Sequence, residues 1–185
     1  TRICEGTLEY RIRLDYILDQ FSTVPADKMK PVIRELLRSS VYQLLYLDHV
    51  PDSAVCNEAV KLARKRGFYN LTGFVNGVLR RIVREYGSIH FPEKNSPVEY
   101  LSVIYSMPVW LVERFLKEYD FATTEKMLES FLETQPATIR IREYQTEEEA
   151  VLESLKEEKV TVEKAPYVDR AYYVKNYDYL PALTA

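Results

Sequence analysis

The sequence predicts a mainly α-helical chain that ends in a small α+β piece. Through about the first 135 residues, apolar side chains recur at helical spacing, and prolines and glycines separate the segments. After Pro136 the period changes: "ATIRIR" alternates between apolar and polar residues as a strand does. Hydrophobic residues make up 46% of the 185 residues, which is typical of a globular protein.

Four helices are predicted in the first half. A segment from about Thr7 to Phe21 is followed by a loop at 23–26, and Pro31 suits the first turn of a helix that ends near Asp48. We expect the third helix to have Asp52 or Ser53 as its N-cap and Gly67 as its end, and the fourth to run from a capping Thr72 to Gly87.

The second half begins with a linker at 88–97 by composition. Ser106 is the predicted cap of a helix with Pro108 in its first turn, and a further helix covers 123–134. Next come a strand with Ile139 and Ile141 on one face, a helix over 146–157, and strand candidates at 159–165 and 170–176, which form a βαββ piece. Thr146 and Glu149 are expected to form a capping box for the helix at 146–157.

Composition narrows the class of protein. No stretch approaches the roughly 20 apolar residues of a membrane span, and Thr1 leads directly into charged residues, so no membrane segment or signal peptide is predicted. Cys4 and Cys56 form no CxxC pair, and His49 and His90 lie far apart. We therefore expect a reduced, cytoplasmic protein without a structural metal.

Charge is distributed unequally between the two halves. Residues 1–91 hold 14 Lys+Arg and 10 Asp+Glu, a net +4, whereas residues 92–185 hold 11 and 18, a net −7. Such asymmetry can mark a half that faces nucleic acid, although scatter of surface charge explains +4 equally well.

No catalytic constellation is visible. The sequence has no glycine-rich phosphate loop after a strand and no Ser/His/Asp set. Both cysteines are surrounded by helix-like sequence without a neighbouring base, so we expect Cys4 and Cys56 to be small core residues.

The third and fourth helices carry basic residues on their polar sides. Cations so placed can bind phosphate oxygens, or can simply be a solvated helix surface. In the fourth helix, Gly73 and Gly77 form a stripe with Asn76 beside it, and we expect this stripe to fix a helix crossing, although an RNA strand could approach it too. The candidate RNA-binding residues are Lys61, Arg64, Lys65, Arg66, Arg80, Arg81 and Arg84.

These residues carry a resemblance. "RSSVYQLLYLDHVPDSAVCNEAVKLARK", followed by "GFVNGVLRR", closely resembles the NusB-like N-terminal domain of the RsmB (Sun/Fmu) family of bacterial ribosomal RNA cytosine-C5 methyltransferases. "EGTLEYRIRLDYIL" resembles the segment before it, and "YSMPVWLVERFLKEY", "PATIRIR" and the helix at 146–157 resemble the region that leads to the catalytic domain. "FVNGVLR" alone is shared with the antitermination factor NusB.

The resemblance implies a fold and a set of domain boundaries. It implies a NusB-like helical RNA-binding domain at 1–91 without its first helix, linking helices at 92–136, and the start of a small α/β subdomain at 137–185. The catalytic domain of that family, which uses S-adenosylmethionine and a nucleophilic cysteine, has no counterpart here: the glycine-rich loop and the Pro-Cys motif are absent. The family's Arg-Val-Asn is Arg140-Ile141-Arg142 here.

Three functions are therefore considered. The favoured one is an RNA-binding N-terminal fragment of such a methyltransferase, with ribosomal RNA and the catalytic domain as partners, no membrane association, and no cofactor in this chain. The second is a standalone NusB-type antitermination factor that binds RNA and a protein partner. The third is a helical protein-interaction module without RNA, which a salt-dependent RNA affinity would exclude.

Overall fold

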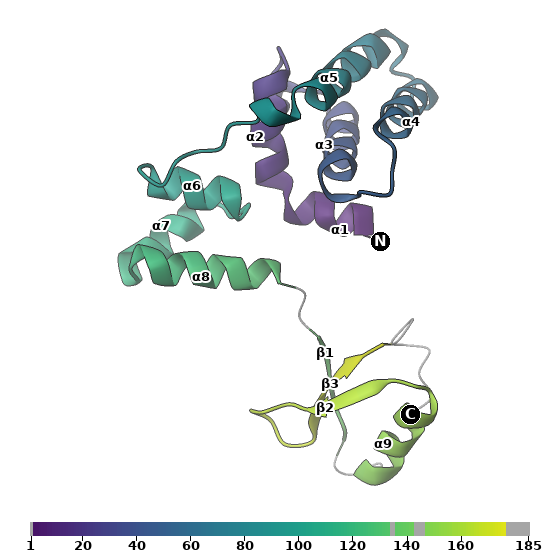
Figure 1. The fold of residues 1–185 in the computed structure, drawn as a ribbon, viewed down its shortest axis with the longest axis vertical. Helices are drawn as coiled ribbons and strands as arrows, with labels where there is room; N and C mark the ends of the chain where they lie inside the picture. The colour runs from purple at the N-terminus through teal and green to yellow at the C-terminus, as the bar shows by residue number, and fades with distance from the viewer. Residues whose placement is uncertain (1, 134–135, 143–146, 177–185) are drawn as a thin grey trace. The chain divides into compact units, whose positions relative to one another are not determined.

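The computed structural model describes residues 2–133, 136–142 and 147–176, which fall into two compact units, Thr1–Leu132 and Glu133–Ala185 (Figure 1). The described part of the first unit is helical, and that of the second combines one helix with a small sheet. The helices of the first unit are α1 (Arg2–Glu9), α2 (Arg11–Phe21), α3 (Pro31–Tyr46), α4 (Asp52–Lys65), α5 (Thr72–Arg84), α6 (Pro97–Ile104), α7 (Val109–Glu118) and α8 (Phe121–Leu132), with short 3-10 turns at Ala26–Lys28, Tyr69–Leu71 and Tyr86–Ser88.

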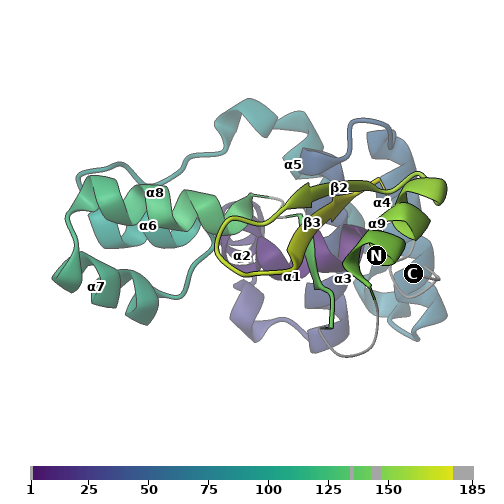
Figure 2. The same ribbon diagram turned by 90° about the horizontal axis from the view of Figure 1, so that it is seen from below.

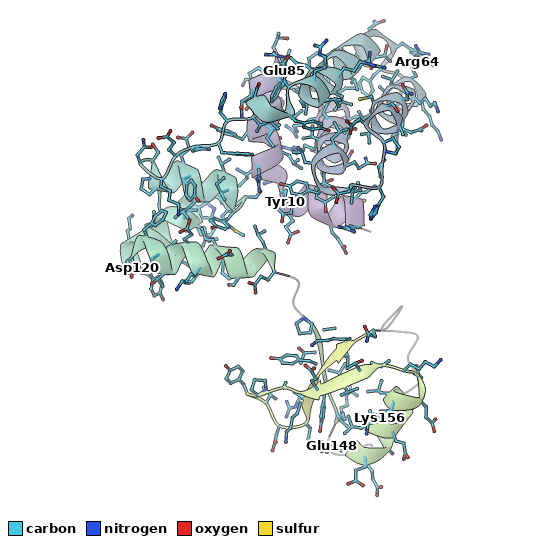
Figure 3. The ribbon with its side chains drawn as sticks, in the orientation of Figure 1. Tyr10, Arg64, Glu85, Asp120, Glu148 and Lys156 are labelled. Carbon is cyan, nitrogen blue, oxygen red and sulfur yellow. The ribbon has the colours of Figure 1, made fainter. Side chains whose placement is uncertain are left out.

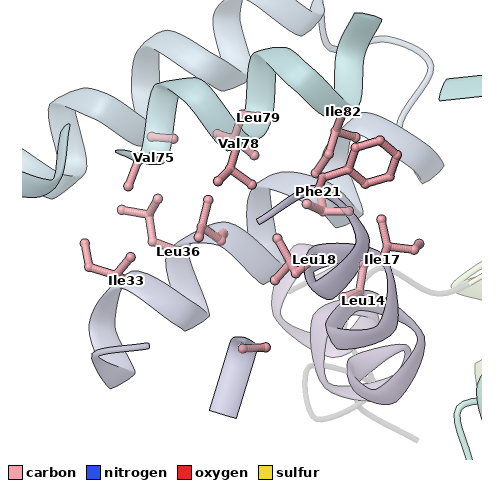
Figure 4. Packing of buried hydrophobic residues seen from close by; sticks show 14 of the residues in the cluster. Leu14, Ile17, Leu18, Phe21, Ile33, Leu36, Val75, Val78, Leu79 and Ile82 are labelled. Carbon is pink, nitrogen blue, oxygen red and sulfur yellow. The ribbon is translucent and has the colours of Figure 1, made fainter. Parts of the chain in front are cut away.

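One apolar core joins α2, α3, α4 and α5 (Figure 4). The apolar face of α5, whose spacing predicted a helix here, is buried, and its four buried side chains point toward α2 and α3. Burial of such side chains is the main force that stabilises the bundle. The core side chains contributed by α2, α3 and α5 include Leu14, Ile17, Leu18, Ile33, Leu37, Val75, Val78, Leu79 and Ile82, all at most 5% exposed.

The first predicted helix is wrong in its extent. It is two helices, α1 and α2, separated at Tyr10. The Tyr10 ring stacks on the Tyr46 ring with centroids 4.7 Å apart, and the Tyr42 ring occupies the place where a β-carbon of Gly6 would lie. The break follows from this aromatic packing with α3, which helical periodicity does not encode.

Ser106 caps a helix, but not the one predicted. The helix after it, α7, begins at Val109 behind Pro108 without a side-chain cap. The Ser106 hydroxyl oxygen instead accepts the N–H groups of Ile12 (3.0 Å) and Arg13 (3.5 Å) at the start of α2. Ser106 therefore satisfies free donors of a helix more than 90 residues away.

Two other predicted caps are also wrong. α4 begins at Asp52 itself, without a side-chain cap, and the Asp52 carboxylate accepts a hydrogen bond from the Tyr86 hydroxyl instead (3.3 Å). Thr72 is the first residue of α5, and its hydroxyl donates to the Tyr69 carbonyl. Gly67 does end α4 as predicted, with a φ of +82° that suits glycine.

Helix α6 was not predicted, because eight residues present too few turns to show a period. It packs with α7 and α8 around Leu101, Val112 and Leu128, and it also contacts α2 (Figure 2). The helices between residues 97 and 132 thus have their own core and still belong to the compact unit of the bundle.

The second unit confirms the βαββ prediction. Strand β1 (Ala137–Arg140), helix α9 (Glu148–Glu157), strand β2 (Thr161–Lys164) and strand β3 (Ala171–Lys175) follow in order. The sheet order is β1-β3-β2, with both pairs antiparallel, and Leu155 of α9 shares a core with Val160 and Val174. The predicted capping Thr146 and the tail at 177–185 lie outside the described residues.

Candidate nucleic-acid interface

Helices α4 and α5 pack together with their apolar sides inward, so their polar sides lie at the surface of the bundle. α4 buries Val55, Cys56, Ala59 and Ala63, while α5 buries the stripe that includes Val75 and Leu79. The basic residues predicted on the polar sides of these two helices therefore lie at the surface of the bundle. In Figure 3 the labelled Arg64 lies at the outer side of the bundle.

A groove of about 450 Å³ runs between the polar sides of α4 and α5. It brings together three of the seven predicted RNA-binding residues, Lys61, Arg64 and Arg80, and two of the three predicted packing residues, Gly73 and Asn76. The remaining lining residues, which sequence reasoning missed, are Asn57, Val60 and Thr72. Asn57 could have been found, because it lies one helical turn before Lys61 on the same face.

The predicted helix crossing at Gly73 and Gly77 is wrong within the described structure. Both glycines are exposed, and a β-carbon added to either would meet no atom of the described residues within 4 Å. The core of α5 uses the opposite face, so no other helix of the bundle reaches this stripe. The exposed Gly77 in the interior of α5 therefore costs helical stability, about 1 kcal/mol relative to alanine, without an internal packing gain.

Hydrogen bonds arrange the side chains of the groove. The Nε of Arg80 donates to the Oδ1 of Asn76 at 2.9 Å, one turn earlier on α5. Lys61 forms an exposed ion pair with Glu58 at 2.6 Å, which partly neutralises it. Arg64 has no carboxylate partner among the described residues. Arg64 and Arg80 are thus the two groove cations most available to an anion.

The other four basic residues do not line the groove. Arg81 packs toward α2: it pairs with Glu85 (3.2 Å), donates to the Phe21 carbonyl (3.3 Å) and lies over the Phe21 ring. Arg66 lines a different, mainly apolar groove beside α1 and α3. Lys65 and Arg84 are exposed, one turn beyond Lys61 and Arg80 on the same helix faces.

The two cysteines differ. Cys56 is a core residue as predicted, 2% exposed, and burial raises the pKa of its thiol, which disfavours the reactive thiolate. Cys4 is exposed, so the predicted core role is wrong for it; it lies at the mainly apolar groove that Arg66 also lines. Among the described residues, no group of three or more His, Cys, Asp or Glu could hold a metal ion.

Comparison with known families now bears on this geometry. Residues 1–84 match the NusB family, and residues 107–177 match the family described as Methyltr_RsmF/B-like, ferredoxin-like domain. The chain joins a NusB domain to an RsmF/B-type ferredoxin-like domain. This pairing confirms the resemblance to the RsmB/Sun family drawn from the sequence.

Individual relatives agree. The chain is 37% identical, over 171 residues, to the probable ribosomal RNA small subunit methyltransferase B of Bacillus subtilis, an alignment that covers 92% of this chain and 38% of the relative. The protein of that name from Synechocystis sp. is 35% identical over 87% of this chain and 36% of its own length. The chain thus spans a little over a third of these relatives.

Two further comparisons concern the first part of the chain and the fold as a whole. The transcription antitermination protein NusB of Acidothermus cellulolyticus is 39% identical over 82 residues, 44% of this chain and 57% of that protein. The crystal structure of PH0851 is similar in fold, with a TM-score of 0.72 and 21% identity over 96% of this chain and 39% of that one. No helix among the described residues is both long and apolar enough to span a membrane.

Proposed function

We propose that this chain is the RNA-binding N-terminal part of an S-adenosylmethionine-dependent small-subunit ribosomal RNA (cytosine-C5) methyltransferase that acts in the cytoplasm. The chain binds ribosomal RNA through the α4–α5 groove and helps present it to a catalytic domain of the same protein. The observation that carries this proposal is a groove lined by three cations on a NusB domain that is joined to an RsmF/B-type domain. The names of the Bacillus subtilis and Synechocystis relatives support the substrate class.

No residue of this chain is assigned a catalytic role. The buried Cys56 is poorly placed to be a nucleophile, and no glycine-rich loop follows a strand to hold a nucleotide-like cofactor. The methyl donor and the nucleophile therefore belong to the catalytic domain in this proposal. The contribution of this chain is affinity for RNA and its orientation.

A NusB-type antitermination factor is the second candidate. The NusB match at residues 1–84 favours it for the first helices. However, the Acidothermus NusB aligns with 44% of the chain, which leaves residues 107–177 and their own family match without a role. The methyltransferase proposal accounts for both parts.

Binding to a small-subunit ribosomal RNA transcript, measured at several salt concentrations, tests the proposal. We expect log affinity to fall linearly with log salt concentration, and the double variant Arg64→Ala/Arg80→Ala to reduce that slope by about 0.7–0.9 for each lost phosphate contact. Lys28→Ala is the matched control, because the Lys28 side chain is 73% exposed, pairs with Asp27 and lies outside the groove. Binding that is absent or independent of salt would instead support a protein-interaction module.

A further inference from the structure

The groove between α4 and α5 offers mainly hydrogen-bond donors, although the amide oxygen of Asn57 and the hydroxyl oxygen of Thr72 can accept. Lys61, Arg64 and Arg80 can only donate. The Thr72 hydroxyl donates its hydrogen to the Tyr69 carbonyl and so adds no donor to the groove. The Glu58 carboxylate pairs with Lys61 on the exposed side of α4. A ligand of this groove must therefore be rich in acceptors.

Asn76 adds a further donor, because Arg80 fixes the orientation of its amide. The Nε of Arg80 has no acceptor capacity, so the Asn76 atom 2.9 Å from it is the carbonyl oxygen. The Asn76 amino group consequently points away from Arg80 Nε, and it donates to no protein group among the described residues. Asn76 and Arg80 together are a preorganised pair of donors on one turn of α5.

We infer, resting on the function proposed above, that this groove binds the phosphodiester backbone of RNA rather than its base edges. Asn76 and Arg80 donate from α5, and Arg64 donates from α4. Phosphate oxygens only accept hydrogen bonds, whereas base edges present donors and acceptors together. A surface made mainly of donors matches phosphate oxygens and leaves the donors of a base edge unsatisfied. Binding here is therefore independent of sequence.

Gly73 lets the backbone approach closely. It lines the groove, is exposed, and a β-carbon there would project into open space. A helix of a partner protein is the other occupant that such a glycine could admit. That helix would have to bury Lys61, Arg64 and Arg80 around it, and burying unpaired cations is unfavourable. An anionic chain pairs with the same cations, so the groove favours RNA.

Asn76→Asp is the sharpest test. The substitution is nearly isosteric and keeps an acceptor for Arg80 Nε, but it replaces the free donor with a carboxylate that repels phosphate. We expect RNA affinity to fall roughly ten-fold or more, because a charge-assisted hydrogen bond is lost, while thermal unfolding is unchanged. Asn95→Asp introduces the same charge in an exposed loop outside the groove and should leave RNA affinity unchanged.

Gly73→Ala provides an independent test with a different signature. The new methyl group lies where we place the RNA backbone, so affinity should fall roughly 5- to 100-fold while the salt slope stays constant, because no cation is lost. Thermal stability should stay equal or rise. Gly87→Ala is the matched control, since Gly87 also faces open space but lies beyond α5.

The outcomes separate this inference from the proposed function. If the unaltered chain shows no salt-dependent affinity for RNA, the proposed function fails and this inference fails with it. If Arg64→Ala/Arg80→Ala weakens binding but Asn76→Asp and Gly73→Ala do not, the proposed function stands and the inference that the groove binds the RNA backbone is overturned. A partner protein would then be the occupant of the glycine stripe. The Asn76→Asp loss must also be equal on two RNAs of the same length and different sequence; a loss that depends on sequence would show base reading and overturn the inference.

Discussion

At the scale of single residues, Gly6 and Gly77 show two opposite reasons for a helical glycine. Gly6 is buried in α1, and a β-carbon there would overlap the ring of Tyr42, which is itself 6% exposed. Gly77 is exposed on α5, and a β-carbon there would lie within 4 Å of no atom of the described residues. We expect Gly6→Ala to destabilise the bundle by about 1–3 kcal/mol through overpacking, and Gly77→Ala to stabilise it by up to about 1 kcal/mol.

Urea unfolding of both variants checks this pair of predictions. Opposite signs are expected in the same helical unit, so a shared experimental error cannot produce them. A loss of stability in Gly77→Ala would show that something packs against the stripe after all, as the sequence had suggested.

Arg38 is the buried cation of the bundle core. It is 7% exposed, and its guanidinium bonds both carboxylate oxygens of Asp15 on α2 and, at 2.5 Å, Glu35 on its own helix. Removing one partner of a buried pair leaves the other charge uncompensated. We expect Arg38→Ala to lower the free energy of unfolding by about 3 kcal/mol.

Arg34→Ala is the control for Arg38, because Arg34 lies on the same helix and pairs with Glu35 near the surface at 3.4 Å. An exposed pair of this kind contributes at most about 1 kcal/mol. Equal losses in the two variants, measured by thermal unfolding, would contradict a structural role for burial at Arg38.

At the scale of elements, Ser106 joins α6 and α7 to the start of α2. It is 8% exposed and has a φ of +54°, a conformation that costs energy for a side chain other than asparagine or aspartate. Ser106→Ala removes the acceptor for the Ile12 and Arg13 N–H groups and should destabilise the unit by about 1 kcal/mol. Ser106→Asn keeps an acceptor and favours the same φ, so its unfolding midpoint in urea should lie above that of Ser106→Ala.

The difference between local patterns and contacts with distant segments explains which elements the sequence could predict. Periodicity is local, so the apolar stripes of α3, α4 and α5 and the alternation around Ile139 predicted their elements correctly. Caps depend on what folds nearby: Ser106 resembles an N-cap for α7, yet the free donors it meets belong to α2. The break at Tyr10 likewise depends on the rings of α3, which are distant in sequence.

Some residues of the candidate site could be predicted from helical spacing, and others required the structure. Lys61, Arg64 and Arg80 could be predicted to lie together, because helical spacing places them on the polar sides of two adjacent helices. Arg81 follows Arg80 directly in the sequence, and only the packing of α5 on α2 shows that it reaches the Phe21 carbonyl instead. The open face of Gly73 also required the structure, since a glycine stripe alone does not reveal whether a helix covers it.

At the scale of the whole molecule, the chain should not bind S-adenosylmethionine by itself. The described part of the second unit is an antiparallel three-stranded sheet with one helix, α9. The dinucleotide-type cofactor sites of doubly wound folds instead lie at the carboxyl ends of parallel strands, beside a glycine-rich turn. Isothermal titration calorimetry at micromolar protein concentration is expected to show no heat of binding. Micromolar affinity in that titration would require a cofactor site that we have not assigned.

The two compact units should differ in their affinity for RNA. Residues 1–132 hold 18 Lys+Arg against 17 Asp+Glu and contain the whole α4–α5 groove, whereas residues 133–185 hold 7 against 11, a net −4. An acidic surface repels phosphate, so the second unit adds little to electrostatic binding.

Cleavage between the units should leave a 1–132 fragment with the affinity and salt slope of the intact chain, because each groove contact contributes to the slope independently of the second unit. Filter binding of the fragment and of the intact chain measures both quantities. A slope that falls by one or more phosphate contacts on cleavage would show that cations of the second unit, despite its net charge, share in the RNA-binding surface.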